Sequence, residues 1–357
     1  MKTLFFDIRH LYYLPQVLPV AEFARSRGAA VTFVLYAEEG ISHVTQNALT
    51  SLHFEYINVS DSRQAIDYYL RSKPDWVILG NAPSSAYLSI KTVGTKLAFM
   101  QHGIGPKSCY YTTSEFDFDV RFVEGQVRKI RLEEMFPNRL FVDAGYAKLD
   151  PIFNHTEQTV TLAHLGLDPV KPTVLYAPTF YPSSLECFKP NWPDELAHCN
   201  LIIKPHFFSL SKPKYIKQQR LLQSWAMYSN VYIAPVEDYS LLPFMQISDV
   251  LLSEASSTVF EFAALDKPVV WCDFYHVRWT YRGIFSFRLN QRLDQDLSMF
   301  HELCERAQSP KDVKRKIEHC LANKQEKSKA RTTITLSMAG KTDGKCSERV
   351  VDYLLSN

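Results

Sequence analysis

The sequence predicts an α/β protein with two doubly wound parallel sheets, each in its own domain. Short runs of aliphatic, β-branched and aromatic residues alternate with helix-like runs in both halves of the chain. Such alternation is typical of parallel strands covered by helices on both faces. The length of 357 residues fits two domains, because one domain usually contains roughly 100–200 residues.

The first half contains a series of strands separated by helices. A helix is expected over residues 14–27, since Gly28 stands where a C-terminal glycine belongs. Asp61 is expected to cap a further helix that runs to Arg71. The predicted strands of this half are residues 4–8, 31–36, 54–59, 76–79 and 96–100.

A break separates this series from a second one. Residues 148–171 are irregular and contain two prolines, a glycine and a polar stretch. We place the domain boundary near Phe153, so residues 1–153 form the predicted first domain and residues 154–340 the second. Residues 341–357 are predicted to contain a helix that crosses back to the first domain.

The second series has the same architecture without repeating the sequence of the first. Helices fill the gaps between its strands, which again favours a parallel sheet. The predicted strands are residues 173–177, 201–204, 231–234, 250–252 and 268–271, and the predicted helices include residues 215–228 and 258–265.

The composition excludes several classes of protein. With 40 Lys+Arg and 38 Asp+Glu the formal net charge is only +2, so nucleic-acid binding is not expected. The 7 cysteines are scattered without a CxxC pair, which is typical of a reducing compartment and of neither a zinc site nor a disulfide framework. Residues 1–9 do not have the pattern expected of a signal peptide, and no apolar stretch reaches the length of about 18 residues that a membrane span needs. We therefore expect a cytoplasmic protein.

The first candidate catalytic residue is His102, in the segment Gln101-His102-Gly103 directly after a predicted strand. Ligands of open parallel sheets bind beyond the carboxyl ends of the strands. Two such domains that face each other would form one deep cleft, with His102 at its mouth. Histidine titrates near neutral pH, which suits a general base. The alternative is a histidine that caps a turn and hydrogen-bonds locally.

Candidate anion-binding residues follow two strands of the second domain. Lys204 and His206 are two donors that suit a diphosphate, or else a surface lysine and a loop histidine. Ser256, Ser257 and Thr258 would place hydroxyls and backbone N–H groups at the start of a helix, where anions bind. Ordinary capping explains one of these three hydroxyls.

Three further residues lie at predicted strand ends or at the domain crossing. Thr179 follows the first strand of the second domain and offers a hydroxyl. Glu254 could accept hydrogen bonds from a ribose, or could favour the helix dipole. Asp150 lies where the chain crosses between the domains. Dinucleotide, P-loop, nucleophile-elbow and zinc-protease motifs are all absent from the sequence.

Taken in order, these segments resemble the CDP-glycerol glycerophosphotransferases of teichoic acid and related polymer synthesis. That family has the GT-B architecture of two Rossmann-like domains. The resemblance covers most of residues 97–283. It departs from the usual family pattern at Gln101, at Phe207 and at Glu254-Ala255. The matching segments are His102-Gly103, Gly145 to Asp150, Tyr176 to Thr179, Lys204 with His206, and Asp249 to Ser257 followed by Lys267-Pro268.

The resemblance implies transfer of an alditol phosphate, glycerol phosphate first of all, from a CDP-linked donor to an acceptor hydroxyl. His102 would take the proton of that hydroxyl, and CMP would leave. The diphosphate would be held by Thr179, Lys204, His206, Glu254, Ser256, Ser257 and Thr258. Gln101, Gly103 and Asp150 would lie on the side of a glycan or lipid-linked acceptor. This mechanism requires no metal ion and no cofactor.

Three alternatives stay open. One is a GT-B glycosyltransferase that uses a nucleotide sugar. A second is a UDP-sugar 2-epimerase, which would usually carry Gly-Gly where Ser256-Ser257 stands. The third is a non-catalytic nucleotide-binding protein.

Contact with a membrane surface is a further expectation. Residues 311–331 carry eight basic and three acidic side chains. They form either a solvated helical face or a contact with anionic lipid at the inner face of the membrane. The second possibility would suit a lipid-linked acceptor.

Overall fold

The computed structural model describes residues 1–105, 109–157, 160–276 and 298–357 of the chain. These residues form two compact units. The first comprises the described parts of residues 1–104, 108–156 and 336–357, and the second those of residues 105–107 and 157–335. Along the chain, this division falls after residue 156, and the chain returns to the first unit at residue 336; the predicted boundaries are near residue 153 and at residue 341.

The first unit is built on a parallel sheet of seven strands in the order β3-β2-β1-β4-β5-β6-β7. All of its strand pairs are parallel. The strand order reverses between β1 and β4, which is the topological switch point where such sheets bind ligands. The strands are β1 (Thr3–Ile8), β2 (Ala30–Tyr36), β3 (Glu55–Val59), β4 (Trp76–Leu79), β5 (Lys96–Met100), β6 (Val120–Val123) and β7 (Phe141–Asp143).

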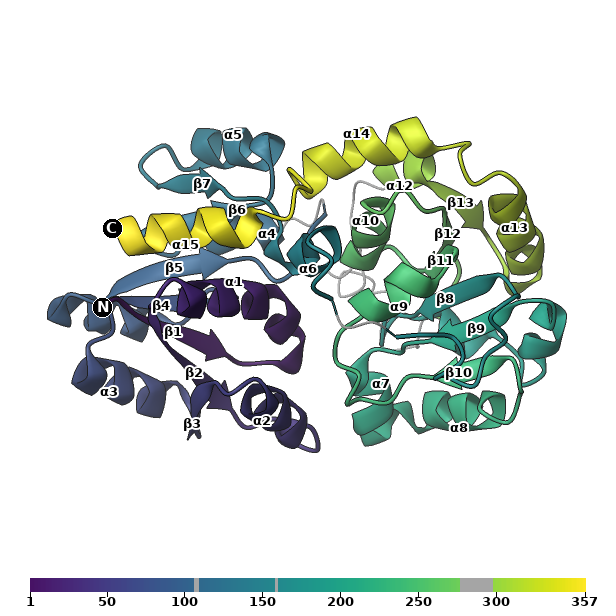
Figure 1. Ribbon diagram of the computed structural model, residues 1–357, viewed down its shortest axis with the longest axis horizontal. Coiled ribbons are helices and arrows are strands. Elements are labelled where there is room, and N and C mark those ends of the chain that lie inside the picture. The colour runs from purple at the N-terminus through teal and green to yellow at the C-terminus, as the bar shows by residue number, and fades with distance from the viewer. Residues whose placement is uncertain (106–108, 158–159, 277–297) are drawn as a thin grey trace, which may run out of the picture. The chain divides into compact units, whose positions relative to one another are not determined.

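Helices cover both faces of this sheet (Figure 1). One face packs its aromatic and aliphatic side chains on α3 and η2, and the opposite face is covered by α1 and α15. The helices of this unit are η1 (Leu11–Tyr13), α1 (Leu14–Ser26), α2 (Ser42–Ser51), α3 (Ser62–Ser72), η2 (Ser85–Val93), α4 (Cys109–Thr112), η3 (Thr113–Glu115), α5 (Gln126–Met135), η4 (Ala147–Leu149), α6 (Asp150–Phe153) and α15 (Cys346–Ser356).

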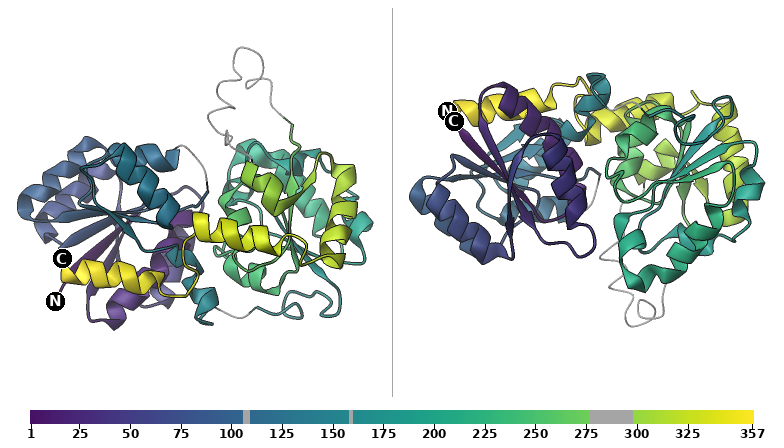
Figure 2. Two further views of the ribbon diagram at one scale, coloured as in Figure 1. Left: turned by 90° about the horizontal axis from the view of Figure 1, so that it is seen from above. Right: turned by 60° about the horizontal axis from the view of Figure 1, so that its bottom comes forward.

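The C-terminal helix α15 is an integral part of the first unit. It runs beside α1, and both chain termini lie at the same end of the unit (Figures 1 and 2). Trp76 on β4 donates its indole N–H to the carbonyl oxygen of Leu354 at 3.0 Å. The side chains of Val350, Val351 and Leu354 are buried in this contact layer.

The second unit contains a parallel sheet of six strands in the order β10-β9-β8-β11-β12-β13. The order reverses between β8 and β11, so this sheet has its own switch point. The strands are β8 (Thr173–Ala177), β9 (Asn200–Ile203), β10 (Val231–Ile233), β11 (Val250–Ser253), β12 (Val269–Cys272) and β13 (Cys304–Ala307).

Alternate residues of these strands face opposite sides, so each side has its own core. One side packs on η5, η6, α8 and α13. The helices of this unit are η5 (Ser184–Cys187), η6 (Trp192–Leu196), α7 (Phe207–Ser211), η7 (Pro213–Tyr215), α8 (Ile216–Trp225), α9 (Leu242–Ile247), α10 (Ser257–Ala263), α12 (Ser298–Leu303), α13 (Pro310–Ala322) and most of α14 (Ser328–Met338).

The predicted fold class, two doubly wound parallel α/β domains, is confirmed. Sequence patterning did not predict β7 or β13, and for β6 it indicated only that the aromatic run around residues 117–119 is a strand. Each has only three or four residues, and Arg121, Glu305 and Arg306 interrupt the apolar pattern. Whether such a segment forms a strand depends on burial and on the neighbouring strand, which its own periodicity does not show.

Candidate active site

His102 lies at the carboxyl edge of the first sheet, just after β5. Its ring nitrogen Nδ1 is 3.0 Å from the carbonyl oxygen of Gly80, which follows β4. Because a carbonyl oxygen only accepts hydrogen bonds, Nδ1 carries the hydrogen. In the neutral ring the lone pair is then on Nε2, and this is the atom that can accept a proton.

Aromatic rings surround the His102 imidazole. The ring centroids of Tyr12 and Tyr13 are 5.0 and 4.7 Å from it, and that of Tyr110 is 6.2 Å away. The hydroxyl of Tyr146 donates to the backbone oxygen of His102 at 3.0 Å. His102 is therefore held by four segments of the first unit, three of which contact its ring and one its backbone.

The residues on either side of His102 are internal to this unit. Gln101 is only 2% exposed, and its Oε1 is buried without a hydrogen-bond partner among the described residues. Gly103 is buried as well. The sequence predicts both on the acceptor side; the Gln101 side chain is buried and glycine has none, so only their backbone atoms are left for such a contact.

Asp150 has a structural use that the sequence did not indicate. Its Oδ2 accepts from the backbone N–H of Ser347 at 2.6 Å and its Oδ1 from that of Cys346 at 3.1 Å. The carboxylate is buried and caps the first turn of α15. We therefore do not retain Asp150 as an acceptor residue.

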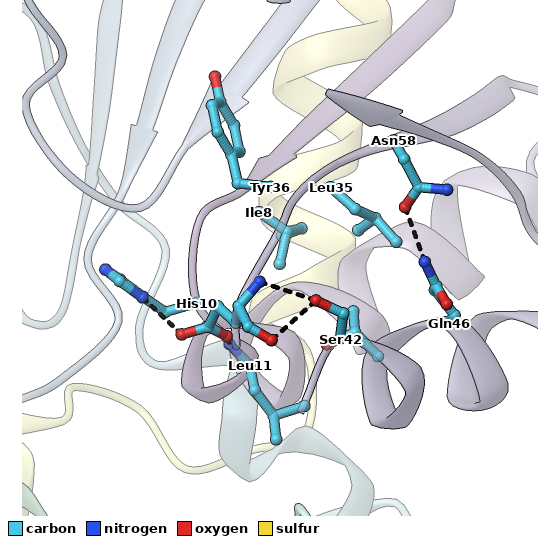
Figure 3. Close-up of a pocket in the computed structure, with 10 residues that line it drawn as sticks. Ile8, His10, Leu11, Leu35, Tyr36, Ser42, Gln46 and Asn58 are labelled. Atoms are coloured by element: carbon cyan, nitrogen blue, oxygen red, sulfur yellow. Dashed lines mark hydrogen bonds and ion pairs between the residues drawn. The ribbon is translucent and has the colours of Figure 1, made fainter. Parts of the chain in front are cut away.

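A second group of polar residues lies at the carboxyl ends of β1 and β2 and was missed from the sequence. Glu38 accepts from the backbone N–H of Leu11 at 2.7 Å, and its other oxygen is 2.8 Å from His10 Nδ1. Glu38 is also linked through its backbone to Ser42. These residues border a small pocket (Figure 3) that also includes Gln46. Because parallel sheets bind ligands beyond the carboxyl ends of their strands, the position of this segment directly after β1 was the signal available in the sequence.

Asp7 is buried inside β1 and was not predicted to matter. Three tyrosine hydroxyls donate to its Oδ2: Tyr36 at 3.1 Å, Tyr69 at 2.9 Å and Tyr87 at 2.9 Å. Arg9 Nε lies 3.5 Å from Oδ1. Burial raises the pKa of Asp7 against the opposing effect of Arg9 and these hydroxyls. An aspartate in an otherwise apolar strand was the signal available in the sequence.

In the second unit, β9, β8 and β11 are neighbours, so the segments that follow them share one edge of the sheet. This brings Thr179, the Lys204–His206 pair and the Ser256–Thr258 segment to the same edge. The strand order, not the sequence spacing, brings these segments together. Parallel sheets bind ligands at this edge.

Lys204 is half-buried directly after β9. Its ammonium group makes no hydrogen bond or ion pair with the described part of the chain. Burial lowers the pKa of Lys204 to about 8, while the carboxylates of Asp238 and Glu237 oppose that shift. Its ammonium group can therefore pair with an anion, in competition with these two carboxylates.

His206 has the opposite hydrogen position to His102. Its Nδ1 accepts from the backbone N–H of Phe208 at 3.2 Å, so the hydrogen of the neutral ring is on Nε2. The rings of Phe180, Phe207 and Phe208 lie 4.7, 4.5 and 5.0 Å from the imidazole centroid. Nε2 of His206 is thus a hydrogen-bond donor, whereas Nε2 of His102 is an acceptor.

Glu254 holds a loop of its own unit. One carboxylate oxygen accepts from Thr179 N at 2.7 Å, and the other accepts from the backbone N–H and the hydroxyl of Ser184 at 2.6 and 2.5 Å. The hydroxyl of Thr179 donates a hydrogen bond to the carbonyl oxygen of Pro182 at 2.6 Å. Burial raises the pKa of Glu254, and these donors counteract the shift. Both side chains therefore shape the 178–184 loop, and neither is retained as a direct donor contact.

Among the described residues, few hydrogen bonds use the hydroxyls at the start of α10. Ser256 Oγ lies 3.3 Å from Ser253 Oγ and does not cap the helix. Over the described residues, no hydrogen bond uses the hydroxyls of Ser257 or Thr258, which are half-buried. Of the predicted donor-binding residues, Lys204, His206, Ser256, Ser257 and Thr258 thus remain candidates.

The Lys267-Pro268 pair that contributed to the resemblance has a structural explanation. Lys267 Nζ donates to the carbonyl oxygens of Met245, Gln246 and Ser248 at 2.9, 2.7 and 2.8 Å. These are orphan carbonyls at the C-terminal end of α9. Lys267 therefore caps a helix and does not belong to the candidate site.

One group in the described chain has the ligand spacing of a metal site. It consists of Glu305, His319 and Glu326. Glu305 is already paired with Lys316 at 2.7 Å and with Lys327 at 3.4 Å, so a cation would have to compete with two ammonium groups. The group belongs to β13 and the helices beside it rather than to the ligand-binding edge.

Among the described residues, no helix combines the length and the apolar character that crossing a bilayer requires.

Similar proteins agree with the resemblance noted in the sequence. Two teichoic acid glycerol-phosphate primases align with a short part of the chain. That of Bacillus spizizenii strain W23 is 31% identical over 102 residues, which are 28% of this chain and 25% of that protein. That of Bacillus subtilis strain 168 is 29% identical over 104 residues, with the same coverage. The alignment thus spans about a quarter of these relatives' length.

Solved structures share the fold over almost the whole chain. The wall teichoic acid polymerase TagF superposes with a TM-score of 0.68 at 14% identity, covering 99% of this chain and 88% of that one. A Staphylococcus aureus MnaA–UDP structure gives a TM-score of 0.66 at 13% identity, with 99% and 96% coverage. A Neisseria meningitidis UDP-GlcNAc 2-epimerase bound to UDP-GlcNAc gives 0.62 at 15% identity, with 100% coverage of both.

The decisive comparison is with a protein family. The family described as CDP-glycerol:poly(glycerophosphate) glycerophosphotransferase matches residues 90–356. This stretch includes β5 with His102, the whole described second sheet and helix α15. The chain therefore belongs to the CDP-glycerol:poly(glycerophosphate) glycerophosphotransferase family.

Proposed function

We propose that this protein transfers glycerol phosphate from CDP-glycerol to a hydroxyl of a glycan or lipid-linked acceptor in cell-surface polymer synthesis. The family supports the donor class. The observation that carries the proposal is the opposite hydrogen position of the two strand-end histidines. One can take a proton from an acceptor, and the other can donate a hydrogen bond to a phosphate.

His102 is the general base of the proposed reaction. Its Nε2 takes the proton of the acceptor hydroxyl, and the oxygen attacks the phosphorus that carries the glycerol. A new P–O bond forms, the bond from this phosphorus to the bridging oxygen breaks, and CMP leaves with that bonding pair. The product is a phosphodiester. General-base catalysis of this kind contributes about 10²–10⁴-fold.

The second unit holds the donor and stabilises the leaving group. Lys204, His206 and the hydroxyls of Ser257 and Thr258 are placed on one sheet edge, where they can surround a diphosphate. Their positive charge and N–H and O–H donors offset the charge that develops on CMP. We assign the acceptor to the first unit and the donor to the second.

The test is CMP release by the purified full chain from CDP-glycerol, with a glycerol-phosphate-primed lipid as acceptor. We expect His102→Ala to lower kcat by about 10²-fold or more with little change in CDP-glycerol affinity. His206→Ala should weaken CDP-glycerol binding instead. His164→Ala, at an exposed site in the second unit, is the matched control.

Other outcomes would select the alternatives. Turnover of UDP-GlcNAc instead of CDP-glycerol would point to a sugar transferase or an epimerase. Nucleotide binding without turnover, unaffected by His102→Ala, would point to a binding protein. Either result would contradict the proposed transfer.

We also propose that the protein touches anionic lipid through residues 311–331, in keeping with a lipid-linked acceptor. Most basic side chains of this segment are already in ion pairs, for example Lys324 with Asp249 and Arg331 with Asp266. Lys311 and Lys329 are exposed and make no ion pair with the described residues. We therefore expect weak, salt-sensitive binding to anionic vesicles that is reduced by Lys311→Glu/Lys329→Glu. Recovery of all protein in the unbound fraction at low salt would contradict this.

A further inference from the structure

We propose that Tyr13 is a positioning residue for His102, and that residue 80 is glycine because any larger residue would displace the Tyr13 ring. This inference rests on the proposed role of His102 as base. It concerns residues that precede the stretch matched by the family. Tyr13 and Gly80 reach His102 from the ends of β1 and β4, on either side of the switch point of the first sheet.

The Gly80 contact is unusually close. A Cβ atom at residue 80 would lie 3.0 Å from Cδ2 of Tyr13 and 3.2 Å from its Cε2. The backbone of Gly80 does not have a positive φ, so its conformation would accept alanine. Glycine is therefore needed at residue 80 for the packing of the ring and not for the turn.

The same glycine orients the imidazole. Its carbonyl oxygen receives the His102 Nδ1 hydrogen at 3.0 Å, while the Tyr13 ring lies on the imidazole at a centroid distance of 4.7 Å and an interplanar angle of 32°. The carbonyl fixes which nitrogen carries the hydrogen, and the ring fixes the plane of the imidazole. Together they direct the Nε2 lone pair.

Tyr13 is in turn held by the segment that follows β1. Its ring meets that of Tyr12 edge-on at 4.6 Å, and its backbone N–H donates to the carbonyl of His10 at 3.0 Å. The carboxylate of Glu38 anchors this segment at Leu11 N and at His10. Tyr13 is 3% exposed, so the ring has no room to move aside without disturbing His102.

The experiment compares Tyr13→Phe, Tyr13→Leu, Gly80→Ala and the double variant Gly80→Ala/Tyr13→Leu in the full chain. We expect Tyr13→Phe, which keeps the ring, to retain nearly the activity of the wild type. Tyr13→Leu and Gly80→Ala should each lower kcat by about tenfold or more, as misplacement of a catalytic group does, with an unchanged KM for CDP-glycerol. The double variant should be no worse than Tyr13→Leu alone, since both changes act on one contact.

The second readout does not depend on the reaction. The ¹⁵N chemical shifts of His102 report which ring nitrogen carries the hydrogen, and we expect Nδ1–H in the wild type and in Tyr13→Phe. Tyr13→Leu and Gly80→Ala should show a mixture of both tautomers while remaining folded. An unchanged tautomer, or multiplicative losses of kcat in the double variant, would overturn the positioning role. An active His102→Ala would refute the proposed base while leaving the tautomer result valid.

Discussion

At the scale of single residues, the backbone partners of the two histidines determine which nitrogen of each ring carries the hydrogen. Both follow a strand, and the sequence predicts a base for His102 and a phosphate-binding donor for His206 without showing which ring nitrogen carries the hydrogen. The carbonyl of Gly80 places the hydrogen of His102 on Nδ1, and the N–H of Phe208 places that of His206 on Nε2. Neither partner could be identified from the sequence, because both depend on which loop lies beside the ring.

Lys204 gives the residue-scale prediction. Since burial lowers its pKa to about 8, its positive charge is present below that pH and is lost as the pH rises through it. We expect the affinity for CDP-glycerol, measured by calorimetry, to fall between pH 7 and 9. Lys204→Met should weaken binding about tenfold or more at pH 7, because it removes the free energy that one hydrogen bond to a charged group contributes.

The variant Lys204→Arg tests whether Lys204, rather than another lysine, causes this pH dependence of binding. An arginine stays charged over this range, so binding by the variant should no longer depend on pH between 7 and 9. Burial lowers the pKa of Lys267 to about 8 as well. A pH dependence that persists in Lys204→Arg would therefore contradict the assignment to Lys204.

At the scale of elements, the structure separates loop-shaping carboxylates from the candidate site. Asp150 and Glu254 were both predicted to meet substrate because they lie at the domain crossing and after a strand. Each is instead surrounded by backbone N–H groups of its own unit. A carboxylate that caps a helix and one that binds a ligand look alike in a sequence, since the distinguishing donors come from distant segments.

Asp150→Ala tests the capping role. Removing the acceptor of two buried N–H groups at the start of α15 should lower the free energy of unfolding by about 1–3 kcal/mol, measured by urea denaturation. Asp150→Asn, which keeps one acceptor oxygen, should be less destabilised. The acceptor KM should not change in either variant. A stable Asp150→Ala protein with a raised acceptor KM would restore the role expected from the sequence.

At the scale of the whole molecule, periodicity predicts the fold class and most strands, because buried parallel strands are continuous apolar runs. It does not predict β7, β13 or the bounds of β6, where the charged residue Arg121 is accommodated by a tertiary contact with Ser114. It predicts the strand-end segments of the candidate site, but not Tyr12, Tyr13 or Gly80. Their importance depends on aromatic packing between segments far apart in the sequence, which no local pattern encodes.

The return of the chain to the first unit gives the last prediction, which concerns truncation after Gly340. This removes α15 and uncovers the layer in which Val350, Val351 and Leu354 are buried. Burial of each such side chain contributes about 1.5–3 kcal/mol, so their loss takes a large part of the ~5–15 kcal/mol by which a domain is stable. The first unit, which carries His102, should therefore lose its cooperative thermal transition.

The second unit should respond differently. Its sheet and all of its candidate donor-binding residues lie outside the deleted segment, and α14 ends at Met338 before the cut. We expect the truncated chain to bind CDP-glycerol in calorimetry with nearly the affinity of the full chain and to release no CMP. Loss of donor binding together with activity would contradict the assignment of the donor to the second unit. Retained CMP release would show that the first unit tolerates the loss of a helix whose carbonyl binds Trp76.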